Sequence, residues 1–374
     1  MIPDFDMSNE KIFSLEKFAE EINSDNLPVF IFGCASLAER VDKILREIGV
    51  NINGWVTDNP KMQKSTVLFK DELIKNYPRY SLVKGFDRLG YVSDEEIKAL
   101  WSGCEKVYNI PNLTDSFYPE SKITREFYLE NKAAFNTVYD NLADELSKKS
   151  LAAFIKARML KRNEVLAPVA VRPQYFFTPP LWNKNPNEVM IDCGAFDGDS
   201  IFDFIQFNGG KYKQVIACEP DPTNLAKLQE NICARDVKNI LVLNLGVGDK
   251  KATLKFDSQA NAGSVISDAG NITISVDTID SVETAVGGGI SLIKMDIEGF
   301  ELSALRGAEN TIIKNRPVLA ISAYHKKDDV FSIYQYLNGI VQGYKFYFRC
   351  HRFDTMDAVM YAVPAERTAQ NLEL

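Results

Sequence analysis

Between residues 187 and 364, short apolar runs alternate with segments of helical periodicity. The runs predict five strands, which are Val189–Asp192, Val215–Cys218, Ile240–Leu243, Ser291–Asp296 and Val318–Ser322. Buried parallel strands have continuous apolar sequences, and helices between them supply the crossovers that parallel pairing needs. Tyr344–Phe348 and Ala358–Val363 have no helix between them, which predicts a final antiparallel hairpin. The pattern therefore predicts an α/β fold with a doubly wound sheet and a reversed final strand.

The first 119 residues carry a smaller pattern of the same kind. An apolar run from Leu27 to Gly33, a helical pattern from Leu37 to Ile48 and an extended segment from Ile52 to Asp58 predict a strand–helix–strand unit. Tyr80–Val83 and Lys106–Ile110 are candidates for further strands. We therefore expect a Rossmann-like domain in this part of the chain.

The loop after the first strand of this domain, residues 33–38, lacks two of the three glycines of a dinucleotide-binding fingerprint. We therefore assign no cofactor to it. Trp55 and Asp58, at the end of the second strand, motivate the hypothesis that this domain recognises the substrate.

The chain divides by composition into four segments. Apolar residues recur at helical spacing after residue 120, at Phe127, Phe135, Val138, Leu142, Leu146 and Leu151, and prolines then accumulate from Pro168 to Pro186. The predicted segments are a Rossmann-like domain at 1–119, a helical connector with a proline-rich linker at 120–186, a catalytic domain at 187–364 and a tail at 365–374.

Charge and cysteine usage narrow the class of protein. A net charge of −8 argues against a nucleic-acid partner, because phosphate binding needs an excess of Lys and Arg. No stretch is long and apolar enough for a membrane span, and no secretory leader is expected at the start. The six cysteines show no C-x-x-C pairing, which indicates buried thiols in a reducing compartment, the cytoplasm. A homo-oligomer is left open.

Ligands of an open parallel sheet bind beyond the carboxyl ends of its strands, so the residues after each strand are the candidates for a site. The first strand leads into a glycine loop and a helix, where free N–H groups face a ligand. The acids around this loop disfavour a pyrophosphate and suit a cationic sulfonium with an amino group. The candidates here are Asp192, Gly194, Ala195, Gly198, Asp199 and Ser200.

Two further strand ends complete the predicted nucleoside site. Glu219, followed by Pro220, ends the second strand, where a carboxylate can accept hydrogen bonds from both hydroxyls of a ribose. Gly246 and Val247 follow the third strand and can form the floor under an adenine.

The fourth and fifth strand ends carry the predicted chemistry. Asp296 and Glu298 lie beyond the fourth strand, where they can bind a cation or steer a substrate hydroxyl. Tyr324 and His325 lie beyond the fifth strand, and His351 follows the sixth. Histidine is the usual general base near neutral pH, so His325 is the predicted base.

The order of these motifs resembles the FkbM-type methyltransferase family. The matching segments are Asp192–Ser200, Cys218–Pro222, Val276–Asp280, Leu292–Leu302, Arg306–Ala308, Arg316–Leu319, Tyr324–His325 and Tyr347–His351. They extend over nearly all of residues 187–364. The resemblance implies a class I methyltransferase fold that binds S-adenosylmethionine at the first three strand ends. It further implies O-methylation of a hydroxyl of a sugar, a nucleotide sugar or a related natural product.

The expected mechanism assigns His325 as the base that takes the proton of the acceptor hydroxyl, oriented or assisted by Asp296, which also contacts the cofactor. Glu298, Tyr324 and His351 are expected to bind the substrate. In a variant of this mechanism, Asp296 and Glu298 hold a divalent cation that acidifies the hydroxyl.

Two other functions remain open at this point. A nicotinamide-dependent oxidoreductase can use a similar fold, although both candidate loops lack the G-x-G-x-x-G pattern. A non-catalytic glycan-binding protein can retain a methyltransferase-like fold without its chemistry. The expected partner in each case is a small molecule or a carbohydrate.

Overall fold

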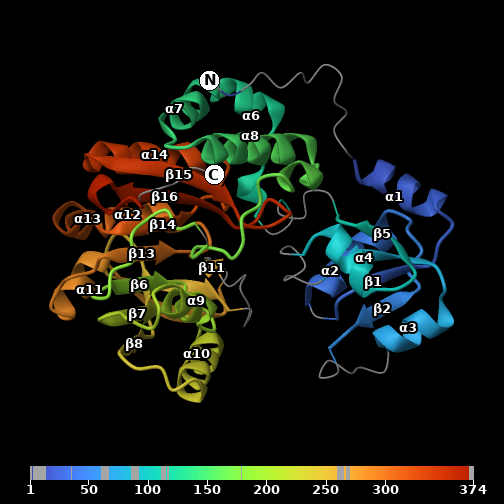
Figure 1. Cartoon of the computed structure of the whole chain (residues 1–374), viewed down its shortest axis with the longest axis horizontal. Coiled ribbons are helices and arrows are strands. Elements are labelled where there is room, and N and C mark those ends of the chain that lie inside the picture. Colours follow the sequence, from blue (N-terminus) through green and yellow to red (C-terminus); the bar gives the residue numbers. More distant parts are fainter. Residues whose placement is uncertain are drawn as a thin grey trace.

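The computed structural model describes residues 2, 14–34, 36–59, 67–85, 92–110, 115, 118–177, 179–258, 265–266 and 270–369. Figure 1 shows a smaller α/β unit formed by the N-terminal part of the chain, in blue, beside a larger α/β body formed by the rest. Among the described helices, none has the length and apolar character needed to cross a membrane.

The larger body is built on a seven-stranded sheet with the order β15-β16-β14-β13-β6-β7-β8. All neighbouring pairs are parallel except those of β16, which is antiparallel to both β14 and β15. The predicted doubly wound sheet with a reversed final strand is therefore confirmed. The strands are β6 (Val189–Cys193), β7 (Gln214–Cys218), β8 (Ile240–Leu243), β13 (Leu292–Met295), β14 (Val318–Ser322), β15 (Tyr344–Cys350) and β16 (Ala358–Pro364).

Helices cover both faces of this sheet because alternate strand residues point to opposite sides. Val189 and Ile191 of β6 belong to one apolar core, and Met190 belongs to the other. The first core includes α11 (Ile279–Ala285), α12 (Glu301–Arg306), α13 (Glu309–Asn315) and α14 (Asp329–Ile340). The second includes α9 (Asp199–Phe207) and α10 (Pro222–Ala234).

A small second sheet lies between β8 and β13 in the sequence, and the sequence pattern did not predict it. Its order is β11-β10-β12-β9. Its strands are β9 (Gly246–Val247), β10 (Ala252–Asp257), β11 (Val265–Ile266) and β12 (Ile272–Asp277). The apolar side of this sheet is small, with Phe256, Ile274 and Val276 as its buried residues.

The N-terminal unit is a five-stranded sheet with the order β3-β2-β1-β4-β5, parallel throughout. It contains the predicted strand–helix–strand unit, and Trp55 lies in β2. Ala35, in the loop after β1, lies outside the described residues. The elements are α1 (Leu15–Ser24), β1 (Val29–Phe32), α2 (Ser36–Glu47), β2 (Gly54–Thr57), β3 (Val67–Phe69), α3 (Lys70–Asn76), β4 (Tyr80–Lys84), α4 (Asp94–Leu100) and β5 (Cys104–Tyr108).

The helical segment that follows packs on the larger body, beside β15 and α14 (Figure 1). It comprises η3 (Pro119–Ser121), α6 (Arg125–Glu130), α7 (Lys132–Asn141), α8 (Glu145–Leu160) and η4 (Asn163–Leu166). Phe135, Val138 and Leu151 are fully buried in the same core as the sheet. At the other end of the chain, η5 (Ala365–Arg367) follows β16, and residues 370–374 lie outside the described ranges.

A buried arginine joins α8 to the sheet. Arg349 of β15 is fully buried, and its Nη2 and Nη1 lie 2.6 and 3.1 Å from the two carboxylate oxygens of Asp144, the N-cap of α8. Nη1 also donates to Ser147 Oγ, and that hydroxyl accepts a hydrogen bond from the Phe348 amide. A planar guanidinium that contacts both carboxylate oxygens fixes orientation as well as distance.

We predict that Arg349→Met lowers the free energy of unfolding of the larger body by about 3 kcal/mol, because it leaves a partly buried carboxylate without its partner. Arg316→Met is the matched control. Arg316 pairs with Glu366 at the surface, where the side chains are 36% and 56% exposed, and its loss should cost about 1 kcal/mol or less. Chemical denaturation followed by circular dichroism gives both values. Equal costs would contradict a special role for Arg349.

Candidate functional site

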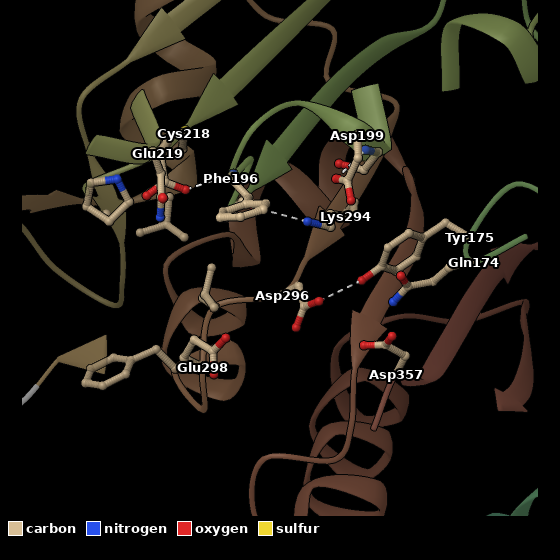
Figure 2. A pocket seen from close by; sticks show the side chains of 18 of the residues that line it. Gln174, Tyr175, Phe196, Asp199, Cys218, Glu219, Lys294, Asp296, Glu298 and Asp357 are labelled. Atoms are coloured by element: carbon tan, nitrogen blue, oxygen red, sulfur yellow. Dashed lines mark hydrogen bonds between the residues drawn. The ribbon is translucent and has the colours of Figure 1, made fainter. Parts of the chain in front are cut away.

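A cavity opens at the carboxyl ends of β6, β7 and β13, where the topology places a ligand. Figure 2 shows side chains from these strand ends pointing into one space. Ten of the predicted site residues line it, and they are Gly194, Asp199, Ser200, Glu219, Pro220, Gly246, Val247, Asp296, Glu298 and Tyr324. The fold thus brings together residues that lie more than a hundred positions apart.

Five predicted residues do not line the cavity. They are Asp192, Ala195, Gly198, His325 and His351. Asp192 is fully buried beneath the cavity, where it accepts a hydrogen bond of 2.5 Å from Ser200 Oγ. The backbone amide of Ala195 donates to Cys218 O of the neighbouring strand. These two residues hold the glycine loop in place.

The glycine loop needs its first glycine for steric reasons. Gly194 adopts φ +79°, and a Cβ at this position would lie 2.0 Å from the backbone oxygen of Asp296. Gly198 adopts φ +92° and is the N-cap of α9. The loop therefore passes close to the end of β13, which brings the first and fourth strand ends together.

Glu219 is the polar anchor at the end of β7. Its two carboxylate oxygens accept hydrogen bonds from the backbone amides of Asp221 and Phe196, at 2.9 and 2.8 Å. Burial raises the pKa of Glu219 to about 7, although both amides act in the opposite direction. The carboxylate is held in one orientation at the cavity, as recognition of a vicinal diol requires.

The cavity wall next to Glu219 is apolar. Leu245 and Val247 line it from the end of β8 and from β9, and Phe256 and Ile274 line it from β10 and β12. Sequence reasoning found Val247 but missed Phe256 and Ile274, because it did not predict the small second sheet. This surface suits a flat heteroaromatic ring.

Asp296 is the carboxylate at the centre of the cavity, and its side chain is 21% exposed. Two buried phenols hold it. Tyr175 donates to Oδ2 at 3.1 Å (Figure 2). Tyr324 donates to Oδ1 at 3.2 Å. Tyr175 comes from the proline-rich segment, which sequence reasoning had treated only as a linker.

Glu298 stands beside Asp296 and adopts φ +58°, a left-handed backbone conformation that is uncommon for non-glycine residues. Burial raises the pKa of Glu298 to about 8, although the nearby His325 lowers it.

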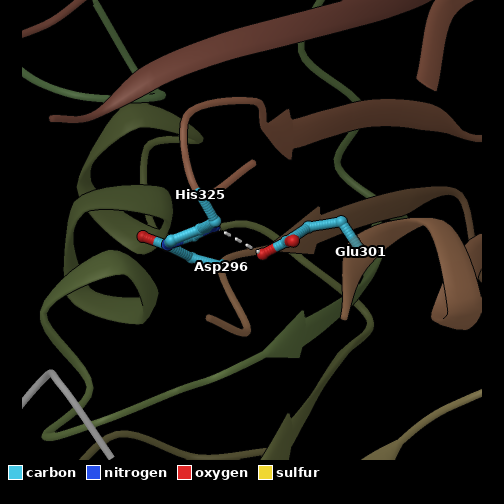
Figure 3. Close-up of side chains that lie close together, drawn as sticks. All are labelled: Asp296, Glu301 and His325. Carbon is cyan, nitrogen blue, oxygen red and sulfur yellow. Dashed lines mark ion pairs between the residues drawn. The ribbon is translucent and has the colours of Figure 1, made fainter. Parts of the chain in front are cut away.

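His325 lies behind this pair, with a side chain that is 1% exposed. Its Nδ1 is 3.0 Å from Glu301 Oε1 (Figure 3), and its Nε2 is 3.6 Å from Asp296 Oδ1 and 3.5 Å from Glu298 Oε2. Burial alone would lower the pKa of His325, but Glu301, Glu298 and Asp296 together raise it to about 10. The ring is therefore an imidazolium at neutral pH. This geometry does not support the predicted role of His325 as the general base.

Asp296, Glu301 and His325 offer ligating atoms that lie within 4.8 Å of one another. Sequence reasoning placed an optional divalent cation between Asp296 and Glu298. In the structure the imidazolium of His325 faces both of these carboxylates and supplies a positive charge there. The divalent cation stays a prediction that this arrangement does not require.

His351 lies away from the cavity. It is fully buried, with Nδ1 2.7 Å from Val171 O and Nε2 2.8 Å from the hydroxyl of Tyr361. Burial lowers the pKa of His351 to about 4. The ring is neutral and joins β15 to the proline-rich segment, so its position does not support the predicted contact with substrate.

Several lining residues were missed by sequence reasoning, and they are Tyr118, Gln174, Tyr175, Lys294, Phe300, Arg352, Met356 and Asp357. Lys294 could have been found, because strand residues two apart share a face and it precedes Asp296 by two positions. The others come from connecting segments whose course the local pattern does not fix.

The comparisons with known proteins agree with this geometry. The family model described as the Methyltransferase FkbM domain matches residues 192–348, which confirms the predicted resemblance. No curated protein matches the chain.

Solved structures resemble the chain to different extents. Methyltransferase FkbM from Methylobacillus flagellatus KT is 23% identical, with a TM-score of 0.63 over 94% of this chain and 94% of that chain, which shows a shared fold. An rRNA methylase from Streptococcus thermophilus is 14% identical, with a TM-score of 0.32 over 50% of this chain and 90% of that chain. Aeropyrum pernix fibrillarin with natively bound S-adenosyl-L-methionine is 13% identical, with a TM-score of 0.32 over 50% and 70% of the two chains.

We predict that neither histidine titrates between pH 6 and 8. The chain has only two, so ¹⁵N imidazole spectra can assign both. His325, with a pKa raised to about 10, should stay protonated, and His351, with a pKa lowered to about 4, should stay neutral. Glu301→Gln should lower the pKa of His325, because it removes the nearest carboxylate. The exposed Glu230→Gln is the control. A titration midpoint near pH 6.5 for His325 in the wild type would contradict its assignment as an imidazolium.

Proposed function

We propose that this chain, which carries an FkbM-type methyltransferase domain, transfers a methyl group from S-adenosylmethionine to a hydroxyl of a sugar, nucleotide sugar or related natural product. One observation carries the proposal. A diol-binding carboxylate, Glu219, and a partly exposed carboxylate that can receive a proton, Asp296, line the same cavity. Neither carboxylate alone would indicate transfer of a methyl group from a nucleoside to an alcohol.

The cavity fits the proposed cofactor along its length. Glu219 suits the two ribose hydroxyls, and the apolar wall of Val247, Phe256 and Ile274 suits the adenine. Asp199 is exposed at the start of α9 and suits an ammonium group. The acids that line the cavity also disfavour the pyrophosphate of a nicotinamide dinucleotide, which argues against the oxidoreductase alternative.

S-adenosylmethionine would supply an electrophilic methyl group. The protein has to hold the acceptor oxygen in line with it and to take the proton of the hydroxyl. We assign the proton to Asp296. The hydrogen bonds from Tyr175 and Tyr324 fix the carboxylate in place, while its exposed fraction leaves it accessible to an acceptor. The buried His325 acts as a positioning residue that keeps Asp296 and Glu298 oriented.

A polyol acceptor is supported by the side chains around Asp296. Tyr118, Phe300 and Met356 offer apolar surface, and the carboxyl groups of Glu298 and Asp357 offer hydrogen-bond partners to hydroxyl groups. Aromatic surface beside hydrogen-bond acceptors suits a sugar ring, which has apolar C–H faces and polar edges. The carboxylate of Asp296 favours a neutral or cationic acceptor group at this place over an anionic one.

We also propose a cytoplasmic location, supported by six cysteines that are all free thiols. Compartment fractionation with a tagged chain tests it, and recovery in an oxidising compartment would contradict it.

Incubation with methyl-labelled S-adenosylmethionine and a panel of sugars, nucleotide sugars and polyketide alcohols, read by mass spectrometry, tests the proposed reaction. A labelled methyl ether is the expected product. Binding of S-adenosylhomocysteine without any turnover over a broad panel would favour the non-catalytic alternative. Binding of a nicotinamide dinucleotide instead would favour the oxidoreductase.

We predict that the affinity for S-adenosylhomocysteine increases from pH 6 to pH 8. The pKa of Glu219 is raised to about 7. The ionised carboxylate, which accepts hydrogen bonds from the ribose hydroxyls, therefore forms only as the pH rises through this value. Below it, affinity should fall by up to about tenfold per pH unit. Calorimetry gives the profile. Glu219→Gln should bind S-adenosylhomocysteine more weakly, and its pH profile should lack the inflection near pH 7. An unchanged inflection in that variant would mean that another group titrates there.

We predict that Asp296→Asn lowers kcat by about 10²-fold to 10⁴-fold, the usual contribution of a positioned base. The affinity for S-adenosylhomocysteine, which has no charge on sulfur, should change much less. The exposed Asp236→Asn is the control. A kcat close to that of the wild type would remove Asp296 from the role of base.

A further inference from the structure

Lys294 is a buried cation in a cavity whose charged lining residues are mostly acids. It lies on β13, its side chain is 5% exposed, and it lines the cavity two residues before Asp296. Figure 2 shows it among Phe196, Asp199 and Tyr175. The proposed mechanism does not use it. Burying an ammonium is costly, so its presence beside a ligand cavity calls for a physical reason.

The contacts of Lys294 leave part of its donor capacity unused. Nζ lies 2.9 Å from Asp192 Oδ1 and donates to Gly194 O at 2.8 Å. An ammonium has three N–H donors. Within the described ranges, its remaining contact is the ring of Tyr175, 5.5 Å away. The pKa of Lys294 is raised, because Asp192 and Asp296 outweigh the effect of burial, so it is fully protonated at neutral pH.

The charges around the cavity make Lys294 the available cation at this end. Of the described lining residues, Arg352 is the other strong cation, and Asp354 holds its Nε and Nη2 at 2.9–3.1 Å. Six acids line the same cavity, and they are Asp199, Asp203, Glu219, Asp296, Glu298 and Asp357. An anionic group of a ligand is therefore stabilised beside Lys294 and disfavoured beside the ionised acids.

The sheet order sets which end of the cofactor reaches Lys294. β13 lies two positions from β7, with β6 between them, so their ends are about 10 Å apart. If Glu219 at the end of β7 binds the ribose, the amino-acid end of the cofactor extends toward β6 and β13. That end carries one ammonium and one carboxylate. Asp199 is the proposed partner of the ammonium.

We infer that Lys294 binds the α-carboxylate of the cofactor and makes the site selective for the complete amino-acid nucleoside. The inference rests on the proposed function and extends it by assigning to one residue the recognition of the ligand's carboxylate. Asp192 keeps the ammonium charged and oriented, and Gly194 O fixes its position. A nucleoside with the same thioether but without the carboxylate should lose this contact and bind more weakly.

The test compares two ligands on two proteins by calorimetry. The ligands are S-adenosylhomocysteine and its decarboxylated analogue, which keeps the amine, and the proteins are the wild type and Lys294→Met. The wild type should prefer S-adenosylhomocysteine by about tenfold or more, as expected for a charge-assisted hydrogen bond. Lys294→Met should bind both ligands with nearly equal affinity. Lys251→Met, at the residue before β10 with an 85% exposed side chain, is the control that should keep the wild-type ratio.

The ratio of affinities separates recognition from a purely structural role. If Lys294 only supports the loop through Asp192 and Gly194, Lys294→Met weakens both ligands equally and the ratio is unchanged, which overturns the inference. Equal binding of both ligands by the wild type also overturns it and needs no folded variant. Binding of neither ligand by the wild type overturns the proposed function together with this inference. Lys294→Arg, which restores a cation, should restore part of the preference.

Discussion

The buried ion pair between Asp192 and Lys294 is the interaction on which the site depends. It joins the ends of β6 and β13, two strands that are neighbours in the sheet but a hundred residues apart in sequence. Breaking such a pair leaves an uncompensated charge in the core, which costs far more than the pair contributes when intact. The pair therefore holds the strand ends in register, with Gly194 packed against Asp296.

Everything in the cavity is arranged around these strand ends. The glycine loop and Glu219 form the nucleoside side, and the small second sheet closes it with apolar side chains. On the other side, Tyr175 and Tyr324 reach Asp296 from two different segments. The two sides of the cavity also differ in electrostatics. Behind Asp296, the imidazolium of His325 balances the negative charge of the nearby acids, while the side of Asp296 that faces the cavity remains available to a substrate.

The two histidines illustrate why residue type alone is a weak guide to chemistry. Sequence reasoning favoured His325 as a base because an unperturbed imidazole titrates near neutral pH. Its pKa depends on three acids, one of which, Glu301, lies on a helix that the motif did not connect with it. The pKa of His351 is shifted in the opposite direction, because burial lowers it and no acidic side chain among the described residues offsets the effect. Such shifts depend on neighbours that only the folded chain brings together.

The sequence by itself determined the sheet, its reversed last strand and the strand-end residues Gly194, Glu219 and Asp296, because hydrophobic periodicity and turn chemistry are local properties. Tertiary structure alone decided the remainder. It placed Tyr175 of a proline-rich segment against Asp296. It also built the apolar wall partly from β10 and β12, whose sequences mix apolar and polar residues and lack the continuous apolar runs of the main sheet. These contacts depend on which segments become neighbours when the two faces of the sheet are buried, and that is a property of the whole chain.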